Sequence, residues 1–147
     1  MTQVHSTTRS RPQLIAFGLS IAALLISAYL TYEHFTGSTT LACSGTQTVN
    51  CLKVTTSQWS VIAGVPVAVA GLAFFVVMTL LCAPTRFAKD VALLRLLGVL
   101  IGTASVLWLV YVELFKVDAI CLWCTAVHVV TLSLLGVVLW WRETDRA

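Results

Sequence analysis

Charged side chains are scarce in this chain of 147 residues. They make up only 10% of it, whereas typical soluble domains carry about 25%. Hydrophobic residues make up 59% of the chain, and its mean hydropathy is +0.93. So little charge excludes an ordinary water-soluble domain, and the composition indicates a chain buried in a lipid bilayer.

Four apolar stretches are long enough to span a membrane as helices. Each has about 20 residues, and at about 1.5 Å per residue such a helix crosses a hydrocarbon core of about 30 Å. They are roughly Leu14–Tyr32, Val61–Leu81, Leu96–Phe115 and Ile120–Trp141. The predicted fold class is therefore all-α, an integral membrane bundle of four transmembrane helices with a polar loop over residues 33–60 between the first two.

The sequence has no internal repeat and no second domain. We expect one membrane domain over residues 13–142, after a disordered segment at 1–12 and before a short tail at 143–147. The first apolar stretch lacks a small-x-small cleavage site close behind it, and it is too long for the apolar region of a signal peptide. It is therefore interpreted as a retained helix.

Basic residues are distributed unevenly between the two ends of the predicted helices. Lys53 and Lys116 fall on one side. The other seven of the nine fall on the opposite side: Arg9, Arg11, Arg86, Lys89, Arg95, Arg142 and Arg146. Because basic residues in short loops favour the cytoplasmic side, both termini are predicted to be cytoplasmic and the 33–60 loop external. The net charge of +3 then reflects topology and gives no reason to expect nucleic-acid binding.

Proline is rare, with three residues, and one of them interrupts the second apolar stretch. Pro66 removes a backbone donor inside that stretch. One interpretation is a short half-helix and turn before the second helix proper, since irregular backbone at membrane depth must be covered by protein or line a cavity. A simple proline kink is the alternative, and both interpretations stay open. Pro84 is expected to end the second helix.

Four of the five cysteines form two pairs of different kinds. Cys43 and Cys51 flank a polar segment of the loop, whereas Cys121 and Cys124 form a C-x-x-C run at the head of the fourth helix. The predicted topology places both pairs at the external face, which in a bacterial envelope is the oxidising side where disulfides persist. Cys82 lies alone near the cytoplasmic side and is interpreted as a small buried hydrophobic residue.

Two cysteine pairs can serve as structural disulfides, as metal ligands or as an electron relay. A structural disulfide explains the loop pair but explains the C-x-x-C run poorly, because a crosslink within one helical turn gains little loop-closure entropy. A zinc site is disfavoured, since zinc sites usually combine two short-spaced motifs and an oxidising face does not keep four thiolates; no metal is predicted. The third use is a relay, in which thiol–disulfide exchange passes electrons to a lipid-soluble quinone.

The position of the C-x-x-C run supports the relay. A helix N-terminus lowers the pKa of a nearby thiol, and Asp118 is expected to cap this helix. Cys121, Cys124 and His128 are spaced i, i+3 and i+7, so they share one helical face. A polar side chain inside a bilayer usually faces a cavity or a partner. His128 is therefore predicted to contact quinone or deliver a proton, and an interhelical hydrogen bond is the alternative.

Other polar and aromatic side chains near the external face receive lesser roles. Glu113, Glu33 and His34 are interpreted as interface residues rather than catalysts. Trp59 and Trp123 lie near the proposed site and are candidates to line it. The remaining tryptophans suit the aromatic belts found at membrane–water interfaces.

Together these features resemble the vitamin K epoxide reductase family. The resemblance covers about residues 10–142 and is carried by the following motifs: Cys43-x7-Cys51 in the first loop, Ser57 six residues later, the Gly64-x-Pro66 turn, and Cys121-x-x-Cys124 opening the fourth helix. The order of the pairs matters. The other quinone-coupled family of four-helix disulfide oxidases places its C-x-x-C in the first external loop, and this chain has the reverse.

The resemblance implies a role for each matching residue. Cys124 would face the quinone, and Cys121 would be its partner and exchange with Cys51. Cys43 would form the outer disulfide with Cys51 and meet the partner protein. Ser57 would hydrogen-bond a quinone carbonyl. Vertebrate members usually have Tyr at position 128 of this chain, so epoxide reduction is not carried over.

The hypothesis from the sequence is a membrane thiol–disulfide oxidoreductase that supports disulfide bond formation. Electrons pass from a reduced thioredoxin-fold (DsbA-like) envelope protein through Cys43/Cys51 and Cys121/Cys124 to menaquinone or ubiquinone. The partner is expected to be a separate protein, because many bacterial relatives carry a fused thioredoxin-like domain and this chain stops soon after the fourth helix. The alternatives are a quinone or vitamin K epoxide reductase running on external thiols, and a non-catalytic four-helix membrane protein with a structural loop disulfide.

Overall fold

The computed structural model describes residues 10–37, 43, 46–85 and 90–146. Most of the segment predicted to be disordered lies outside these ranges, as do Arg9, Arg86 and Lys89. The elements, in chain order, are α1 (Arg11–Thr36), α2 (Cys51–Thr55), the 3-10 turn η1 (Gln58–Ser60), β1 (Val61–Ile62), β2 (Val65–Pro66), α3 (Val67–Cys82), α4 (Ala92–Val112), the π-helical turn η2 (Glu113–Val117) and α5 (Leu122–Arg146).

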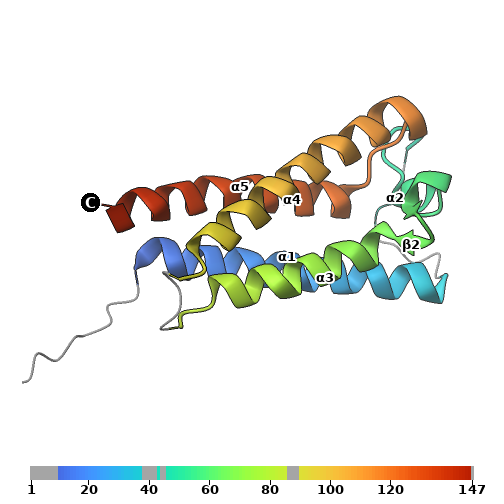
Figure 1. Cartoon of the computed structure of the whole chain (residues 1–147). Helices are drawn as coiled ribbons and strands as arrows, with labels where there is room; N and C mark the ends of the chain where they lie inside the picture. Colours follow the sequence, from blue (N-terminus) through green and yellow to red (C-terminus); the bar gives the residue numbers. More distant parts are fainter. Residues whose placement is uncertain (1–9, 38–42, 44–45, 86–89, 147) are drawn as a thin grey trace, which may run out of the picture.

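Helices α1, α3, α4 and α5 form the bundle that the sequence predicts. α1 packs against both α3 and α5, and α4 packs against α5 and α3 (Figure 1). The start of α1 and the end of α5 lie at one end of the bundle, whereas α2 and β2 lie at the other (Figure 1). A disulfide between Cys43 and Cys51 lies in the connection that follows α1. The cysteine-bearing connection is therefore at the end of the bundle remote from the two chain ends.

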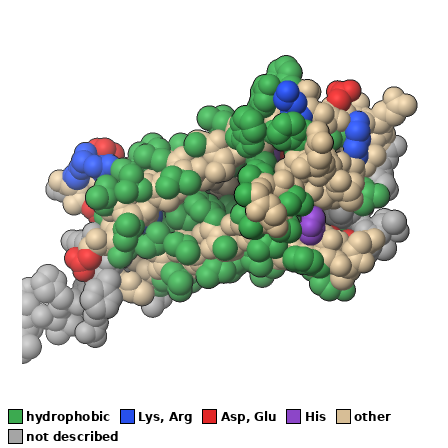
Figure 2. Space-filling model, turned by 45° about the vertical axis from the view of Figure 1, so that its right-hand side comes forward, with side chains coloured by type: hydrophobic (Ala, Val, Ile, Leu, Met, Phe, Trp, Pro, Cys, Tyr) green, Lys and Arg blue, Asp and Glu red, His purple; other side chains and the backbone are tan. Residues whose placement is uncertain are grey.

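The exterior of the bundle is apolar along most of its length. Leu25, Leu80 and Ile101 are 65%, 69% and 63% exposed. Figure 2 shows hydrophobic side chains over the middle of the visible face and charged ones gathered toward its two ends. Helices α1, α4 continued through η2, and α5 are long and apolar enough to cross a membrane, whereas α3 has 16 residues and spans about 24 Å. The chain is thus a multi-pass membrane protein, and the predicted fold class is confirmed.

A stripe of small side chains on α1 lets the bundle close. Ala16, Ser20, Ala23 and Ser27 recur every three or four residues, and none is more than 3% exposed. Small residues allow helix backbones to approach closely inside a bilayer. The Ser20 hydroxyl is satisfied within α1, because it donates to the Ala16 carbonyl at 2.8 Å. α1 therefore offers both α3 and α5 a smooth packing surface.

The segment before α3 forms a β-hairpin, which corrects the helix predicted over Val61–Leu81. β1 and β2 pair antiparallel, and the two residues between them, Ala63 and Gly64, have φ angles of 52° and 82°. A two-residue hairpin turn of type I′ requires positive φ at both positions. Pro66 ends β2 directly before the first turn of α3, where no intrahelical partner is needed for its missing N–H. Of the two interpretations of Pro66, the structure has the turn and not the kink.

Side chains of α3 and α5 pack closely against Gly102 of α4. A Cβ atom at this position would lie 2.6 Å from Cζ of Phe74 on α3 and 3.4 Å from Cγ2 of Thr131 on α5. Phe74 is itself packed edge-to-face against Phe75, with ring centroids 5.0 Å apart. The glycine is thus required by the space between three helices.

We expect Gly102→Ala to lower the thermal unfolding midpoint of the detergent-solubilised protein, because forcing a methyl group into a packed core costs about 1–3 kcal/mol. Gly136→Ala is the matched control, since a Cβ there meets nothing within 4 Å and gains the same helix propensity. The difference between the two variants isolates the packing cost. Equal midpoints for both would contradict close packing at Gly102.

Candidate functional site

The loop disulfide joins Cys43 to Cys51, the first residue of α2. The S–S distance is 2.07 Å, and the two Cα atoms are 5.5 Å apart. Asn50 precedes α2 and caps it, because its Oδ1 accepts the Lys53 N–H at 2.9 Å. Cys51 N–H also donates to the Cys43 carbonyl at 3.3 Å. The short helix and its cap therefore fix the position of Cys51, which is fully buried.

A pair of backbone hydrogen bonds ties this loop to the segment before α5. Asn50 N–H donates to the Ile120 carbonyl at 3.0 Å, and Ile120 N–H donates to the Thr48 carbonyl at 2.8 Å. These bonds make a parallel bridge between Val49 and Ile120. As a result Cys43, Cys51 and Cys121 pack into one buried cluster, against which Cys124 is also packed. The structure thus brings all four predicted redox cysteines together.

The N-terminus of α5 is the centre of this cluster. The first N–H groups of a helix have no intrahelical partner, and here three nearby N–H groups point at sulfur or carboxylate. Leu122 N–H donates to Cys43 Sγ at 3.4 Å and Cys124 N–H to Cys121 Sγ at 3.2 Å. Cys121 N–H donates to Glu113 Oε2 at 3.5 Å. Cys121, the residue before α5, therefore caps the helix with its own sulfur.

The expectation that Asp118 caps α5 is wrong. Asp118 is exposed and ends η2 in the left-handed conformation, with φ 52°, and its backbone N–H donates to the Glu113 carbonyl. Ala119 and Ile120 separate Asp118 from Cys121. Because Ile120 pairs with Val49 of the loop, α5 begins only after Cys121. The thiol thus takes the capping position that a carboxylate usually takes.

The two inner cysteines differ in their chemistry. A hydrogen bond from the Cys124 thiol lowers the pKa of the Cys121 thiol, against the opposing effect of burial. The Cys124 N–H lowers this pKa further, whereas the Glu113 carboxylate raises it. Cys121 is fully buried beside the loop disulfide, and Cys124 is only partly buried. Because a thiol of lower pKa ionises more readily and also leaves a disulfide more readily, the two inner cysteines have unequal reactivity.

The predicted quinone-binding residues come from two parts of the chain, α5 and the segment around η1. His128 is on α5 with Cys124 and is 6% exposed. Ser57 donates to the Val54 carbonyl at 2.8 Å and lines a cavity of about 340 Å³ on the α1 and α2 side. Trp59 packs against the cluster of Val112, Val117 and Ala119 around η2. Cys124 and His128 thus share α5, and Ser57 and Trp59 lie around α2 and η1.

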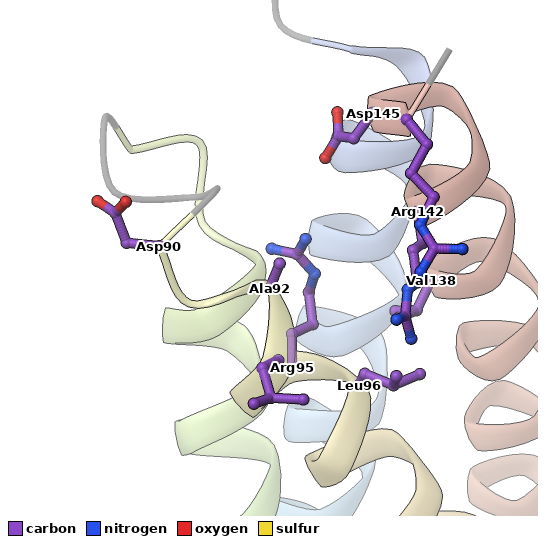
Figure 3. A pocket seen from close by; sticks show the side chains of 9 residues that line it. Asp90, Ala92, Arg95, Leu96, Val138, Arg142 and Asp145 are labelled. Atoms are coloured by element: carbon purple, nitrogen blue, oxygen red, sulfur yellow. The ribbon is translucent and has the colours of Figure 1, made fainter.

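A larger cavity, about 450 Å³, lies between α4 and α5 at the opposite end of the bundle. Figure 3 shows Arg95 from α4 and Arg142 from α5 on its two sides. The Arg95 guanidinium is 3.4 Å from the centroid of the Trp141 ring, so the cavity borders a buried cation–π contact. Within the described part of the chain, Cys124 lines neither cavity.

The described residues contain no group of three or more His, Cys, Asp or Glu side chains that could hold a metal ion. Two of the four clustered sulfurs are bonded to each other as Cys43–Cys51. Disulfide sulfurs are not thiolate ligands, so in this state the cluster offers exchange chemistry and not a zinc site.

Two contacts of the site were not predicted from the sequence. One is the hydrogen bond between Leu122 N–H and Cys43 Sγ, which depends on how the loop folds onto α5. The other is the position of Glu113, a 6% exposed carboxyl group beside Cys121. An acidic residue inside an apolar stretch, eight positions before a cysteine, was the available signal. The contact with Cys121 could not be predicted from the sequence, because it depends on how η2 folds back toward α5.

Comparison with known proteins places the chain in a family. No curated protein matches it. The model of the vitamin K epoxide reductase family matches residues 14–139, which include both cysteine pairs, all of α3 and α4, and most of α1 and α5. This class of membrane proteins comprises quinone reductases and thiol oxidoreductases, in agreement with the clustered cysteines. The chain therefore belongs to the vitamin K epoxide reductase family.

Proposed function

We propose that this protein is a membrane thiol–disulfide oxidoreductase that carries electrons from a reduced thioredoxin-fold protein to a membrane quinone, menaquinone or ubiquinone. The observation that carries the proposal is the packing of the Cys43–Cys51 disulfide and Cys121 in one buried cluster at the start of α5. Disulfide exchange needs sulfur atoms in contact. A disulfide that only stabilises the loop does not require a second pair of free thiols beside it.

The first exchange takes place at the loop disulfide. A thiolate of the reduced partner attacks Cys43, forms a mixed disulfide with it and releases Cys51 as a thiolate. Cys43 is the more accessible of the two, at 7% exposed against 0% for Cys51. The second thiol of the partner then attacks the mixed disulfide. The partner leaves oxidised, and Cys43 and Cys51 are left reduced.

The second exchange moves the electron pair inward. The Cys51 thiolate attacks Cys121 of an oxidised Cys121–Cys124 pair, forms a Cys51–Cys121 disulfide and releases Cys124. Cys43 then attacks Cys51, which restores the outer disulfide and leaves the inner pair reduced. The Leu122 N–H, 3.4 Å from Cys43 Sγ, favours the Cys43 thiolate that carries out this last attack.

The inner pair then reduces quinone. Two thiols and one quinone give one disulfide and one quinol, with two electrons and two protons transferred. Cys124 is assigned the quinone side, because it is the less buried inner cysteine and shares α5 with His128. His128 contacts the quinone or delivers a proton. Ser57 and Trp59 are assigned to the same quinone site, Trp59 as part of the lining and Ser57 as donor to a quinone carbonyl, for which its hydroxyl turns away from the Val54 carbonyl.

The orientation of the protein is part of the proposal. Four described arginines lie at the end where the chain begins and ends: Arg11, Arg95, Arg142 and Arg146. Lys53 of α2 and Lys116 of η2 lie at the cysteine end. The excess of basic residues at that end supports a cytoplasmic location of the termini and an external location of the cysteines. Disulfides persist on that side, and a separate thioredoxin-fold envelope protein can reach them there.

Cys124→Ala should lower the rate of quinone reduction by at least about a hundredfold, because it removes the nucleophile of the last step. The assay follows quinone absorbance with purified protein and a reduced DsbA-like protein as donor. Cys82→Ala is the matched control, since Cys82 is buried in the core cluster near the other end of the bundle. A Cys124→Ala variant as fast as the parent would show that the relay is wrong.

Cys43→Ala should affect the rate of quinone reduction differently with two electron donors, a small dithiol and the DsbA-like protein. A small dithiol can reach Cys121 and Cys124 directly, so quinone reduction with that donor should continue at about the parent rate. Transfer from the DsbA-like protein should fail, because its entry residue is missing. Equal activity of the variant with both donors would remove Cys43 from the pathway.

A further inference from the structure

Glu113 is a buried carboxyl group held against the inner cysteine pair. It begins η2, and its backbone carbonyl accepts N–H groups from Asp118 and, at 3.2 Å, from Ala119. These bonds fold the chain back toward the bundle. The Glu113 side chain is 6% exposed, and its Oε2 accepts the Cys121 N–H at 3.5 Å. The fold therefore holds this carboxyl group at the N-terminus of α5, where Cys121 also lies.

The cysteine pair is the ionisable group that Glu113 faces most directly. From α2, Lys53 directs its Nζ to the Asp118 carbonyl, at 3.3 Å. From η2 itself, Lys116 is exposed and lies 5.9 Å from the centroid of the Trp59 ring, and Asp118 is exposed. Val112, Val117 and Ala119 supply the apolar surroundings of η2. From α5, the groups are Cys121 and Cys124.

A negative charge at this position acts against a thiolate. The N-terminus of a helix favours one nearby anion, and here a carboxylate and a thiolate share it. Like charges in a poorly solvated site disfavour each other more strongly than in water. The disulfide form of the pair carries no charge and does not meet this repulsion. When Glu113 is ionised, its carboxylate therefore raises the free energy of the thiolate form of the reduced pair relative to the oxidised pair.

We propose that Glu113 is a positioning residue whose charge makes the Cys121–Cys124 pair a stronger electron donor. The contrast is with exchange proteins that are strong oxidants because their reduced thiolate form is stabilised. In the overall step the pair loses two electrons and two protons, the S–S bond forms, and Glu113 itself is unchanged. The identification of quinone as the electron acceptor rests on the proposed function. The effect of the Glu113 charge on the cysteine pair does not depend on which acceptor is used.

Two neutral variants test the proposal in the protein with all five cysteines present. Glu113→Gln keeps an oxygen that can accept the Cys121 N–H, whereas Glu113→Leu keeps neither oxygen nor charge. The alkylation rate of Cys121 is measured against pH by mass analysis of the labelled peptide, without quinone or partner. Both variants should move the midpoint down by about one pH unit, since a like charge has been removed.

The same variants should change the redox equilibrium of the pair. In a glutathione redox buffer, the ratio of reduced to oxidised Cys121–Cys124 should rise up to about tenfold, which corresponds to about 30 mV for a two-electron couple. Asp118→Asn is the matched control, because it removes an exposed carboxylate from the same turn and Asn tolerates positive φ. It should leave both the midpoint and the ratio at the parent values.

The proposal is overturned if Glu113→Gln keeps the parent midpoint and ratio. It is also overturned if only Glu113→Leu shifts them, because the lost hydrogen bond and not the charge would then be the cause. If Glu113→Leu fails to fold, Glu113→Gln decides the proposal on its own; if Glu113→Gln fails to fold, parent values in Glu113→Leu still overturn the proposal. Neither measurement involves quinone, so failure here leaves the electron relay untouched, and failure of the relay leaves these shifts in place.

Discussion

The arrangement of the cysteines depends on the N–H groups at the start of α5. In most helices water or a polar cap satisfies these groups. Here Leu122 N–H meets the sulfur of Cys43 and Cys124 N–H meets the sulfur of Cys121. The amide of Cys121 meets the carboxyl group of Glu113. One helix end thus connects the loop disulfide, the inner thiol pair and η2, and it does so with the interactions that stabilise anionic sulfur.

Packing of the four-helix bundle holds that helix end in place. The small stripe on α1 lets α5 and α3 pack on either side of it, and Gly102 lets α4 close over α3 and α5. The bridge between Val49 and Ile120 then sets the loop against the start of α5. A single pair of backbone hydrogen bonds is a modest interaction, about 1 kcal/mol each. This loop can therefore be held near Cys121 and still release to exchange partners.

The four helices could be predicted from the sequence, because burial in a bilayer requires long apolar stretches. The hairpin and the helix cap could not, because they depend on backbone hydrogen bonds between distant segments. The length and hydropathy of the apolar stretches identified the four helices. The distribution of basic residues predicted that both cysteine pairs lie at the same end of the bundle. The hairpin at Ala63 and Gly64 was predicted as helix because apolar residues before a helix look the same as residues within it. The cap was assigned to Asp118 by residue type, whereas the bridge at Ile120 gave that position to Cys121. Ser57 and Trp59 lie around α2 and η1 in the structure, and their contact with quinone stays a prediction.

The central claim is that the two cysteine pairs form one pathway, with Cys51 handing electrons to Cys121. The most direct measurement is non-reducing mass analysis of a Cys43→Ala variant whose thiols are trapped after incubation with quinone and the reduced DsbA-like protein, without a small dithiol. With Cys43 removed, a Cys51–Cys121 disulfide cannot be resolved from the loop side, so it should accumulate. If Cys51 stays a free thiol throughout turnover while Cys121 bonds only to Cys124, the two pairs do not communicate and the account is contradicted.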